Sequence, residues 1–266
     1  MNQIEASIRE AGRMILEAHI QNSNIHQKSG PANFVTDYDV KIQKFLIDRL
    51  TEILPGCSFY GEEDTEHNEH ILGNNPTFFI DPIDGTTNFM FDYHNSCVSV
   101  GLAEQKEITA GWVYNPYTDQ MFTARRGEGA WLIENNRKNE NNVPARRRLT
   151  IENKGLEEGI CAFGCARYNA GDGIFDILPE LFNHSLAIRS GGSAAIDLCR
   201  IASGSNVAYI EMLLQPYDYA AASVIIEEAG GIISQTADET ITLDKGCPIL
   251  AGTPKATEEI RKLLKV

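Results

Sequence analysis

The sequence carries few positive charges for its length. Its 266 residues include 23 Lys or Arg against 37 Asp or Glu, which gives a net charge of −14 and a pI near 4.9. Proteins that bind nucleic acids need a basic face against the phosphate backbone, so this balance argues against a nucleic-acid partner. The main basic run, Arg146–Arg148, borders a polar Asn-rich stretch and is predicted to be a solvated loop.

Long apolar runs and zinc-type cysteine clusters are also missing. No segment reaches the roughly 18 consecutive apolar residues of a membrane-spanning helix, and charges within the apolar pattern of residues 1–19 argue against a signal-peptide core. Three residues separate Cys161 from Cys165, and no histidine pair completes a zinc set. His67 and His70 lie in an acidic stretch typical of an exposed loop. We expect a cytoplasmic protein with reduced thiols and no membrane segment.

Apolar periodicity predicts helices and then a run of strands in the first half. Ile4, Ile8 and Ile15 recur at helical spacing, and Thr36 followed by Asp39 resembles the cap of a second helix that ends near residue 53. The stretch 28–35 between them is expected to be a loop or a short hairpin. Strands are predicted near 77–80, 96–103, 108–114, 119–124 and 130–133. The Asn-rich stretch 134–142 is the expected boundary between two halves.

Strands and helices alternate in the second half. The predicted order is strand 159–164, helix 172–182, strand 185–190, helix 193–204, strand 207–212, helix 218–229, two short strands and helix 254–264. A meander followed by alternation predicts an α/β fold of stacked helix and sheet layers. We interpret residues 1–266 as one domain, with an N-terminal half of about 1–140 and a C-terminal half of about 141–266.

The stretch "FFIDPIDGTTNF" (78–89) places two carboxylates directly after an apolar strand. Pro and Gly favour a simple turn here. The alternative is a ligand site, because Asp81 and Asp84 would meet at a sheet edge and Gly85 lets the backbone approach a ligand. Two acids beside the hydroxyls and amides of Thr86 and Thr87 suit divalent cations that hold a phosphate.

Further carboxylates each have a structural explanation of their own. Glu62 and Glu63 follow an apolar stretch and begin an acidic segment that suits a loop. Asp218 stands at the start of a predicted helix, where Asp is a preferred N-cap. Asp39 can act as the capping acid of its helix. Considered one at a time, these residues do not distinguish a metal site from local structure.

Together the motifs resemble the inositol monophosphatase family of magnesium-dependent, lithium-sensitive sugar phosphatases. The resemblance is carried by "GEE" (61–63), "DPIDGTTNF" (81–89) and a D-x-A-A helix from Asp218 that ends in "EAGG" (228–231), and it extends back to Lys28 and "FVTDYD" (34–39). It implies a sugar phosphatase fold with α-β-α-β-α layers. It also implies a cytoplasmic homodimer that uses Mg²⁺ and a metal-activated water to hydrolyse inositol monophosphate to inositol and phosphate.

The resemblance further implies which residues bind two to three Mg²⁺ ions. Glu62, Asp81 and the carbonyl of Ile83 would hold the first ion. Asp81 would bridge to a second ion, which Asp84 and Asp218 would also hold. A third, weaker position would lie near Glu62. In this family pattern two cations stabilise the attacking and leaving oxygens and lower the pKa of a bound water.

Catalytic roles are implied in the same way. Glu62 and Thr86 would orient and deprotonate the attacking water, and Asp39 would accept a hydrogen bond from the Thr86 hydroxyl. Glu63 lies beside Glu62, and Lys28 would belong to a loop near the metal and the phosphate. Substrate-binding residues are expected to be Asp84, Gly85, Thr86, Gly192, Ser193, Ala194 and Glu211.

Two departures from the family pattern and several alternatives remain at the level of sequence. Tyr217 stands where the family usually has Trp, and the Asn-rich loop is longer than usual. The same fold also serves fructose-1,6-bisphosphatases and phosphatases of adenosine 3′,5′-bisphosphate or NADP. Arg167 and Tyr168 either bind a second phosphate or lie on the surface. A regulatory binding protein with residual phosphatase activity is the alternative of a different class.

Overall fold

The computed structural model describes residues 3–21, 24–28, 30–64, 73–134, 145–166 and 173–265. Several features singled out above lie outside the described residues: His67, His70, Arg167, Tyr168 and the Asn-rich stretch after Glu134. Within the described ranges, no helix is long and apolar enough to cross a membrane. All six cysteines are described and all are free.

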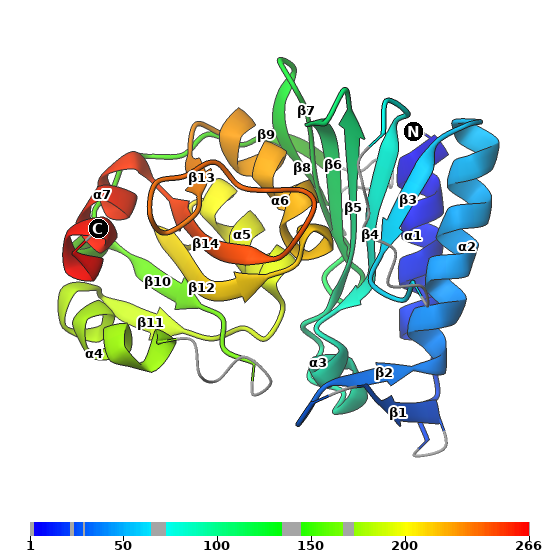
Figure 1. The fold of residues 1–266 in the computed structure, drawn as a ribbon, viewed down its shortest axis with the longest axis horizontal. Helices are drawn as coiled ribbons and strands as arrows, with labels where there is room; N and C mark the ends of the chain where they lie inside the picture. The colour runs from blue at the N-terminus through cyan, green and yellow to red at the C-terminus, as the bar shows by residue number, and fades with distance from the viewer. Residues whose placement is uncertain are drawn as a thin grey trace.

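Helices and sheets alternate in layers across the molecule (Figure 1). The first layer consists of α1 (Gln3–Leu16) and α2 (Asp37–Ile53), with the hairpin of β1 (Ile25–Gln27) and β2 (Phe34–Thr36) at the start of α2. Their apolar faces pack on a seven-stranded sheet. Its strands, in spatial order, are β3 (Ser58–Gly61), β4 (Thr77–Asp84), β5 (Cys97–Glu104), β6 (Glu107–Asn115), β7 (Gln120–Arg125), β8 (Gly129–Glu134) and β9 (Ala145–Arg148).

The other face of this sheet packs on α5 (Ala194–Ala202) and α6 (Pro216–Glu228), which separate it from a second sheet. The five strands of that sheet run in the order β11 (Ala187–Arg189), β10 (Ile160–Phe163), β12 (Ala208–Leu214), β14 (Cys247–Gly252) and β13 (Ile232–Ser234). The outer layer is α4 (Ile174–His184) and α7 (Pro254–Leu264), near the 3₁₀ turn η2 (Leu156–Glu158). These are the α-β-α-β-α layers that the sequence predicts.

Two local predictions were wrong. The basic run is not a loop, because Arg146–Arg148 form the exposed edge strand β9, paired with β8. The guanidinium carbon of Arg146 lies 4.3 Å from the centroid of the Trp131 ring, and this stacking gives the edge strand an apolar partner. In addition, the strand predicted to end near residue 80 runs on through Asp84. This second difference determines the shape of the site.

Candidate active site

The end of β4 carries the first two carboxylates into a cavity. Every residue from Thr77 to Asp84 is buried, and the pairing with β5 shifts register between Asp81 and Asp84. Pro82 lies in this irregularity, where a missing N–H is tolerated. Gly85 then adopts a left-handed conformation, with φ of 93°, and caps the short helix α3 (Thr86–Met90). The predicted turn is therefore a bulged strand that leads directly into a helix.

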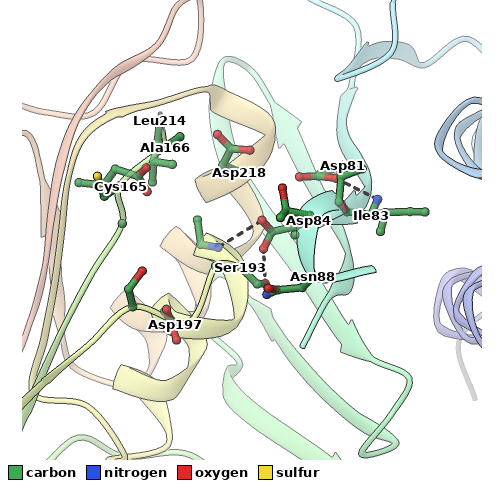
Figure 2. Close-up of a pocket in the computed structure, with 18 of the residues that line it drawn as sticks. Asp81, Ile83, Asp84, Asn88, Cys165, Ala166, Ser193, Asp197, Leu214 and Asp218 are labelled. Atoms are coloured by element: carbon green, nitrogen blue, oxygen red, sulfur yellow. Dashed lines mark hydrogen bonds between the residues drawn. The ribbon is translucent and has the colours of Figure 1, made fainter. Parts of the chain in front are cut away.

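One cavity of about 380 Å³ brings together all of the predicted metal-binding and substrate-binding residues (Figure 2). They are Glu62, Asp81, Ile83, Asp84, Gly85, Thr86, Gly192, Ser193, Ala194, Glu211 and Asp218. The cavity lies where the end of β4 and the start of α3 face the starts of α5 and α6 (Figure 2). Lys28, Asp39 and Glu63 do not line it. Lys28 contacts Glu62 and Asp39 contacts Thr86, which both line it, and Glu63 contacts Lys28.

Asp84 joins the two halves of the chain. Its carboxylate accepts hydrogen bonds from the Ser193 hydroxyl at 2.5 Å and from the amides of Ala195 at 2.8 Å and Ala194 at 3.2 Å. These amides begin α5, so Asp84 caps that helix from another element. The Ala194 amide, which we expected to meet substrate, is thus already engaged by Asp84.

Burial and repulsion by neighbouring charges raise the pKa values of three aspartates in the cavity, Asp81, Asp84 and Asp218. Burial raises the pKa of Asp81, and the charges of Glu62, Asp84 and Asp218 raise it further. Asp218 follows the same pattern, with burial first and then the charges of Asp84 and Glu62. Burial raises the pKa of Asp84 to about 6 even though the hydrogen bonds from Ser193, Ala195 and Ala194 lower it. A cation bound between crowded, buried acids of this kind stabilises their ionised forms.

The donor set fits a hard divalent cation. Glu62, Asp81, Asp84 and Asp218 offer carboxylate oxygens, and the backbone of Ile83 offers a carbonyl. Over the described ranges, no three acidic, histidine or cysteine side chains are grouped so that they could hold a metal ion as they stand. The fit of a cation therefore rests on the chemistry and burial of the carboxylates.

Lys28 reaches the edge of this site from the β1–β2 hairpin. Its Nζ atom lies 3.0 Å from Oε1 of Glu62 and 2.6 Å from Oε1 of Glu63. Burial lowers the pKa of Lys28, but the two glutamates outweigh it and raise the pKa overall. Burial and the charge of Glu62 raise the pKa of Glu63 to about 7 despite the bond from Lys28. The single ammonium group of Lys28 therefore does not fully compensate the negative charge of two half-buried glutamates.

Asp39 makes the contacts of both roles that the sequence left open. Its Oδ2 atom accepts bonds from the amide and hydroxyl of Thr36, at 2.8 and 2.5 Å, and so caps α2. The Thr86 hydroxyl lies 3.4 Å from Oδ1 of Asp39 and 3.3 Å from the carbonyl oxygen of Ile83. Asp39 is completely buried, and burial raises its pKa to about 6. The Thr86 hydroxyl thus shares its one proton between two long, weak hydrogen bonds.

Asp218 and Glu211 differ from their expected local settings. The cap of α6 is Gln215, not Asp218, which occupies the third helical position and accepts a bond from the Gln215 amide at 2.7 Å. Glu211 is not at the end of its strand, because β12 continues to Leu214. It is only 8% exposed and accepts a short hydrogen bond from the Tyr209 hydroxyl. Glu211 therefore points into the cavity and not to solvent.

Several residues that line the cavity were not predicted from the sequence, among them Asn88, Asp197 and Tyr209. Asn88 donates from Nδ2 to the carbonyl oxygens of Asn95 and Gly191, at 2.7 and 2.9 Å. Asp197 and Tyr209 also line the cavity and are buried. A signal existed for two of them. Asn88 lies within the "DPIDGTTNF" motif. Tyr209 is two residues before Glu211, so the side chains of Tyr209 and Glu211 share one face of β12.

The comparisons with known proteins point in one direction. A sequence model of the inositol monophosphatase family matches residues 2–265. The chain is 34% identical over 254 residues to the inositol-1-monophosphatase of Bacillus subtilis, which covers 95% of this chain and 91% of that protein. It is also 34% identical over 261 residues to human inositol monophosphatase 1, with coverage of 97% and 91%.

Solved structures agree with these relatives. The extragenic suppressor protein suhB from Bartonella henselae superposes with a TM-score of 0.84 at 30% identity, over 100% of this chain and 98% of that one. The inositol monophosphatase-II of Staphylococcus aureus gives a TM-score of 0.78 at 28% identity, over 98% and 91% of the two chains, in a structure with inositol monophosphate. The same enzyme was also solved with 2′-AMP.

Proposed function

The chain belongs to the inositol monophosphatase family, and we propose that it is a Mg²⁺-dependent phosphomonoesterase that hydrolyses inositol monophosphate to inositol and phosphate. Phosphatase activity follows from family membership, because these relatives are phosphoric monoester hydrolases. The substrate, the cation, inhibition by Li⁺, a cytoplasmic location and a homodimer are the further parts of the proposal. The division into a metal-binding N-terminal half and a substrate-binding C-terminal half belongs to it as well.

One observation carries the proposal. Three aspartates, Asp81, Asp84 and Asp218, share a single cavity with Glu62 and with the start of α3. The amides at the start of a helix have no partner within it and suit a phosphate group. Buried carboxylates beside an anion site would repel a phosphate unless cations joined them. This combination supports a phosphate ester bound together with Mg²⁺.

The residues of this chain have distinct roles in the proposed reaction. When bound, Mg²⁺ supplies positive charge to the phosphate and makes a water more acidic. The amides of Gly85 and Thr86 orient the phosphate. The Thr86 hydroxyl donates a hydrogen bond to Asp39 and accepts one from the attacking water with its oxygen. Glu62 accepts the proton that this water loses as its oxygen bonds to phosphorus, and the departing inositol oxygen takes up a proton from solvent as the ester bond breaks. Lys28 holds Glu62 and Glu63 in place at the edge of the site.

The alcohol part of the substrate would lie on the C-terminal side of the cavity. Glu211 and Ser193 offer polar atoms there, and Glu211 is held by Tyr209. The S. aureus relative binds both inositol monophosphate and 2′-AMP, so a nucleotide phosphate is the second candidate substrate. The test is phosphate release from a panel that contains inositol monophosphate, 2′-AMP, adenosine 3′,5′-bisphosphate, NADP and fructose 1,6-bisphosphate. A nucleotide hydrolysed best would replace the proposed substrate.

Replacement of Glu211 by Gln is expected to change substrate preference more than chemistry. A hydrogen bond to a charged acceptor contributes roughly 1.5–3 kcal/mol, so kcat/KM for inositol monophosphate should fall about ten- to a hundredfold above the pKa of Glu211, which is about 7. A small flexible ester such as β-glycerophosphate lacks the ring hydroxyls and should be nearly unaffected. Both substrates are measured on wild type and Glu211→Gln. Equal losses on both would mean that Glu211 supports the metal site or the fold instead.

The same residue predicts a pH dependence of stability in the absence of cations. Burial raises the pKa of Glu211 from 4.5 to about 7, although the Tyr209 hydroxyl lowers it. Since the protonated form is favoured in the fold, wild type loses stability as the pH rises through that interval. At 1.36 kcal/mol per pKa unit, the free energy of unfolding of Glu211→Gln, relative to that of wild type, should rise by about 2 kcal/mol between pH 5 and pH 8. Urea unfolding in EDTA measures this, and a constant difference would contradict it.

A further inference from the structure

The loop between β11 and α5 borders two hollows in the surface. Ser190 and Asp197 line both the catalytic cavity and a neighbouring groove that also includes Asn95 and Arg200. The loop residues Gly191 to Ser193 therefore form the wall between them. The side chains in the neighbouring groove have no role in the reaction proposed above. They do, however, make a connected set of contacts with this wall.

Both backbone polar groups of Gly191 are held by side chains. Its amide donates to Oδ2 of Asp197 at 2.9 Å. Its carbonyl oxygen accepts bonds from Nδ2 of Asn88 at 2.9 Å and from Nδ2 of Asn95 at 2.8 Å. Asp197 belongs to α5, whereas Asn88 and Asn95 belong to the segment from α3 to β5. The loop is thus fixed from both halves of the chain.

Arg200 connects the two sets of partners. One guanidinium nitrogen donates to Oδ1 of Asp197 at 2.7 Å, and the other donates to Oδ1 of Asn95 at 3.1 Å. Asp197 is only 2% exposed, and a buried carboxylate without a partner is costly. The charge of Arg200 offsets this cost, and its planar fork reaches both partners at once. Lysine has a single charged nitrogen and cannot reproduce this geometry.

The fixed loop in turn sets the spacing across the catalytic cavity. A Cβ atom on Gly85 would lie 2.9 Å from the Gly192 carbonyl oxygen and 3.3 Å from Cβ of Ser193, so the loop packs directly on the start of α3. Ser193 also donates its hydroxyl proton to Asp84. A displaced loop would therefore move the C-terminal wall of the cavity relative to the phosphate-binding amides.

We propose that Arg200, acting with Asp197 and Asn95, is a positioning unit that fixes the Gly191–Ser193 loop and thereby selects rigid polyol phosphates over small esters. Arg200 does not touch the substrate in this proposal. The proposal deepens the function given above and rests on it. It assigns Arg200 a role through KM, because the alcohol side of the cavity would be displaced while Asp84 keeps its bonds from the Ala194 and Ala195 amides and the other acids lie on β4 and α6.

The test compares Arg200→Met with Arg189→Met. Arg189 lines the same groove, but its guanidinium donates only to the neighbouring Ile188 carbonyl among the described residues, which makes it a matched control. Arg200→Met should raise KM for inositol monophosphate about tenfold, with kcat and the values for β-glycerophosphate within about twofold of wild type. Arg189→Met should change neither substrate. The KM of Arg200→Lys for inositol monophosphate should lie between those of Arg200→Met and wild type.

A second readout does not depend on activity. Amide hydrogen exchange over residues 190–195 should be at least about tenfold faster in Arg200→Met than in wild type or Arg189→Met, because the Gly191 amide loses its fixed acceptor. Equal KM increases for both substrates, or unchanged exchange in this segment, would overturn the proposal. Wild type that hydrolyses neither substrate would refute the proposed function, and the exchange result would still decide whether Arg200 fixes the loop.

Discussion

Asp81→Asn is expected to lose Mg²⁺-dependent phosphate release by at least about a thousandfold while the protein remains folded. Asp81 is 2% exposed and carries a carboxyl that Glu62, Asp84 and Asp218 all repel. Asparagine has the same shape but removes the charge that a bridging cation needs. Asp84→Asn should have a similar effect on activity, with some added loss of stability because Asp84 also caps α5.

The control for this prediction is Asp92→Asn. Asp92 follows α3 in sequence, but its side chain is 89% exposed and contacts only His94 among the described residues. Its replacement should leave kcat and KM unchanged. Circular dichroism and urea unfolding in EDTA check that each variant is folded. Turnover of Asp81→Asn at the wild-type rate would show that the carboxylates hold no catalytic cation.

Thr86→Ala and Asp39→Asn are each expected to lower kcat by about a hundredfold or more, with KM within about threefold of wild type. The reason is that both act on the attacking water, and a positioned acid–base group typically contributes 10²–10⁴-fold. The double variant should be no slower than the worse single variant, because the two residues act through one hydrogen bond. Steady-state kinetics on inositol monophosphate measures all three.

Asp39 has a structural role that this experiment must separate. Its contacts with Thr36 cap α2, and loss of a helix cap costs about 1 kcal/mol. Asp37→Asn is the matched control, because Asp37 lies in the same first turn, is exposed, and contacts Asn24 and His26 instead. If Asp39→Asn loses stability but keeps its turnover, Asp39 is a cap alone and the catalytic pair with Thr86 is refuted.

The elements of the layered fold and the motifs of the cavity could be predicted because short stretches of the sequence encode them. Helical spacing in α1 and the capping pair Thr36 and Asp39 mark their elements directly. The motif around Asp81 indicates a strand end, and the motif around Asp218 indicates a helix start. The family resemblance implies that the two belong to one site. That these segments meet in one cavity was implied by the family resemblance and not by the local patterns.

The remaining features depend on contacts between distant segments. Asp84 caps α5, which lies more than a hundred positions away in sequence, and no local pattern around either residue announces this bond. The edge strand β9 forms because β8 offers an open edge and the Trp131 ring, which the charge of Arg146–Arg148 alone does not reveal. Arg200 looks like an ordinary helix arginine until its contacts with Asp197 and Asn95 are seen.

Phosphate release from inositol monophosphate with and without Mg²⁺ decides whether the cavity is a cation-dependent phosphatase site. The purified protein is stripped with EDTA, and phosphate release is followed as MgCl₂ is returned, with thermal unfolding recorded at each concentration. We expect no turnover in EDTA, recovery with Mg²⁺, and a rise in Tm over the same range, because cations bind between the buried carboxylates around Asp81. Full turnover in EDTA, with a Tm that Mg²⁺ does not change, would contradict a cation-dependent site.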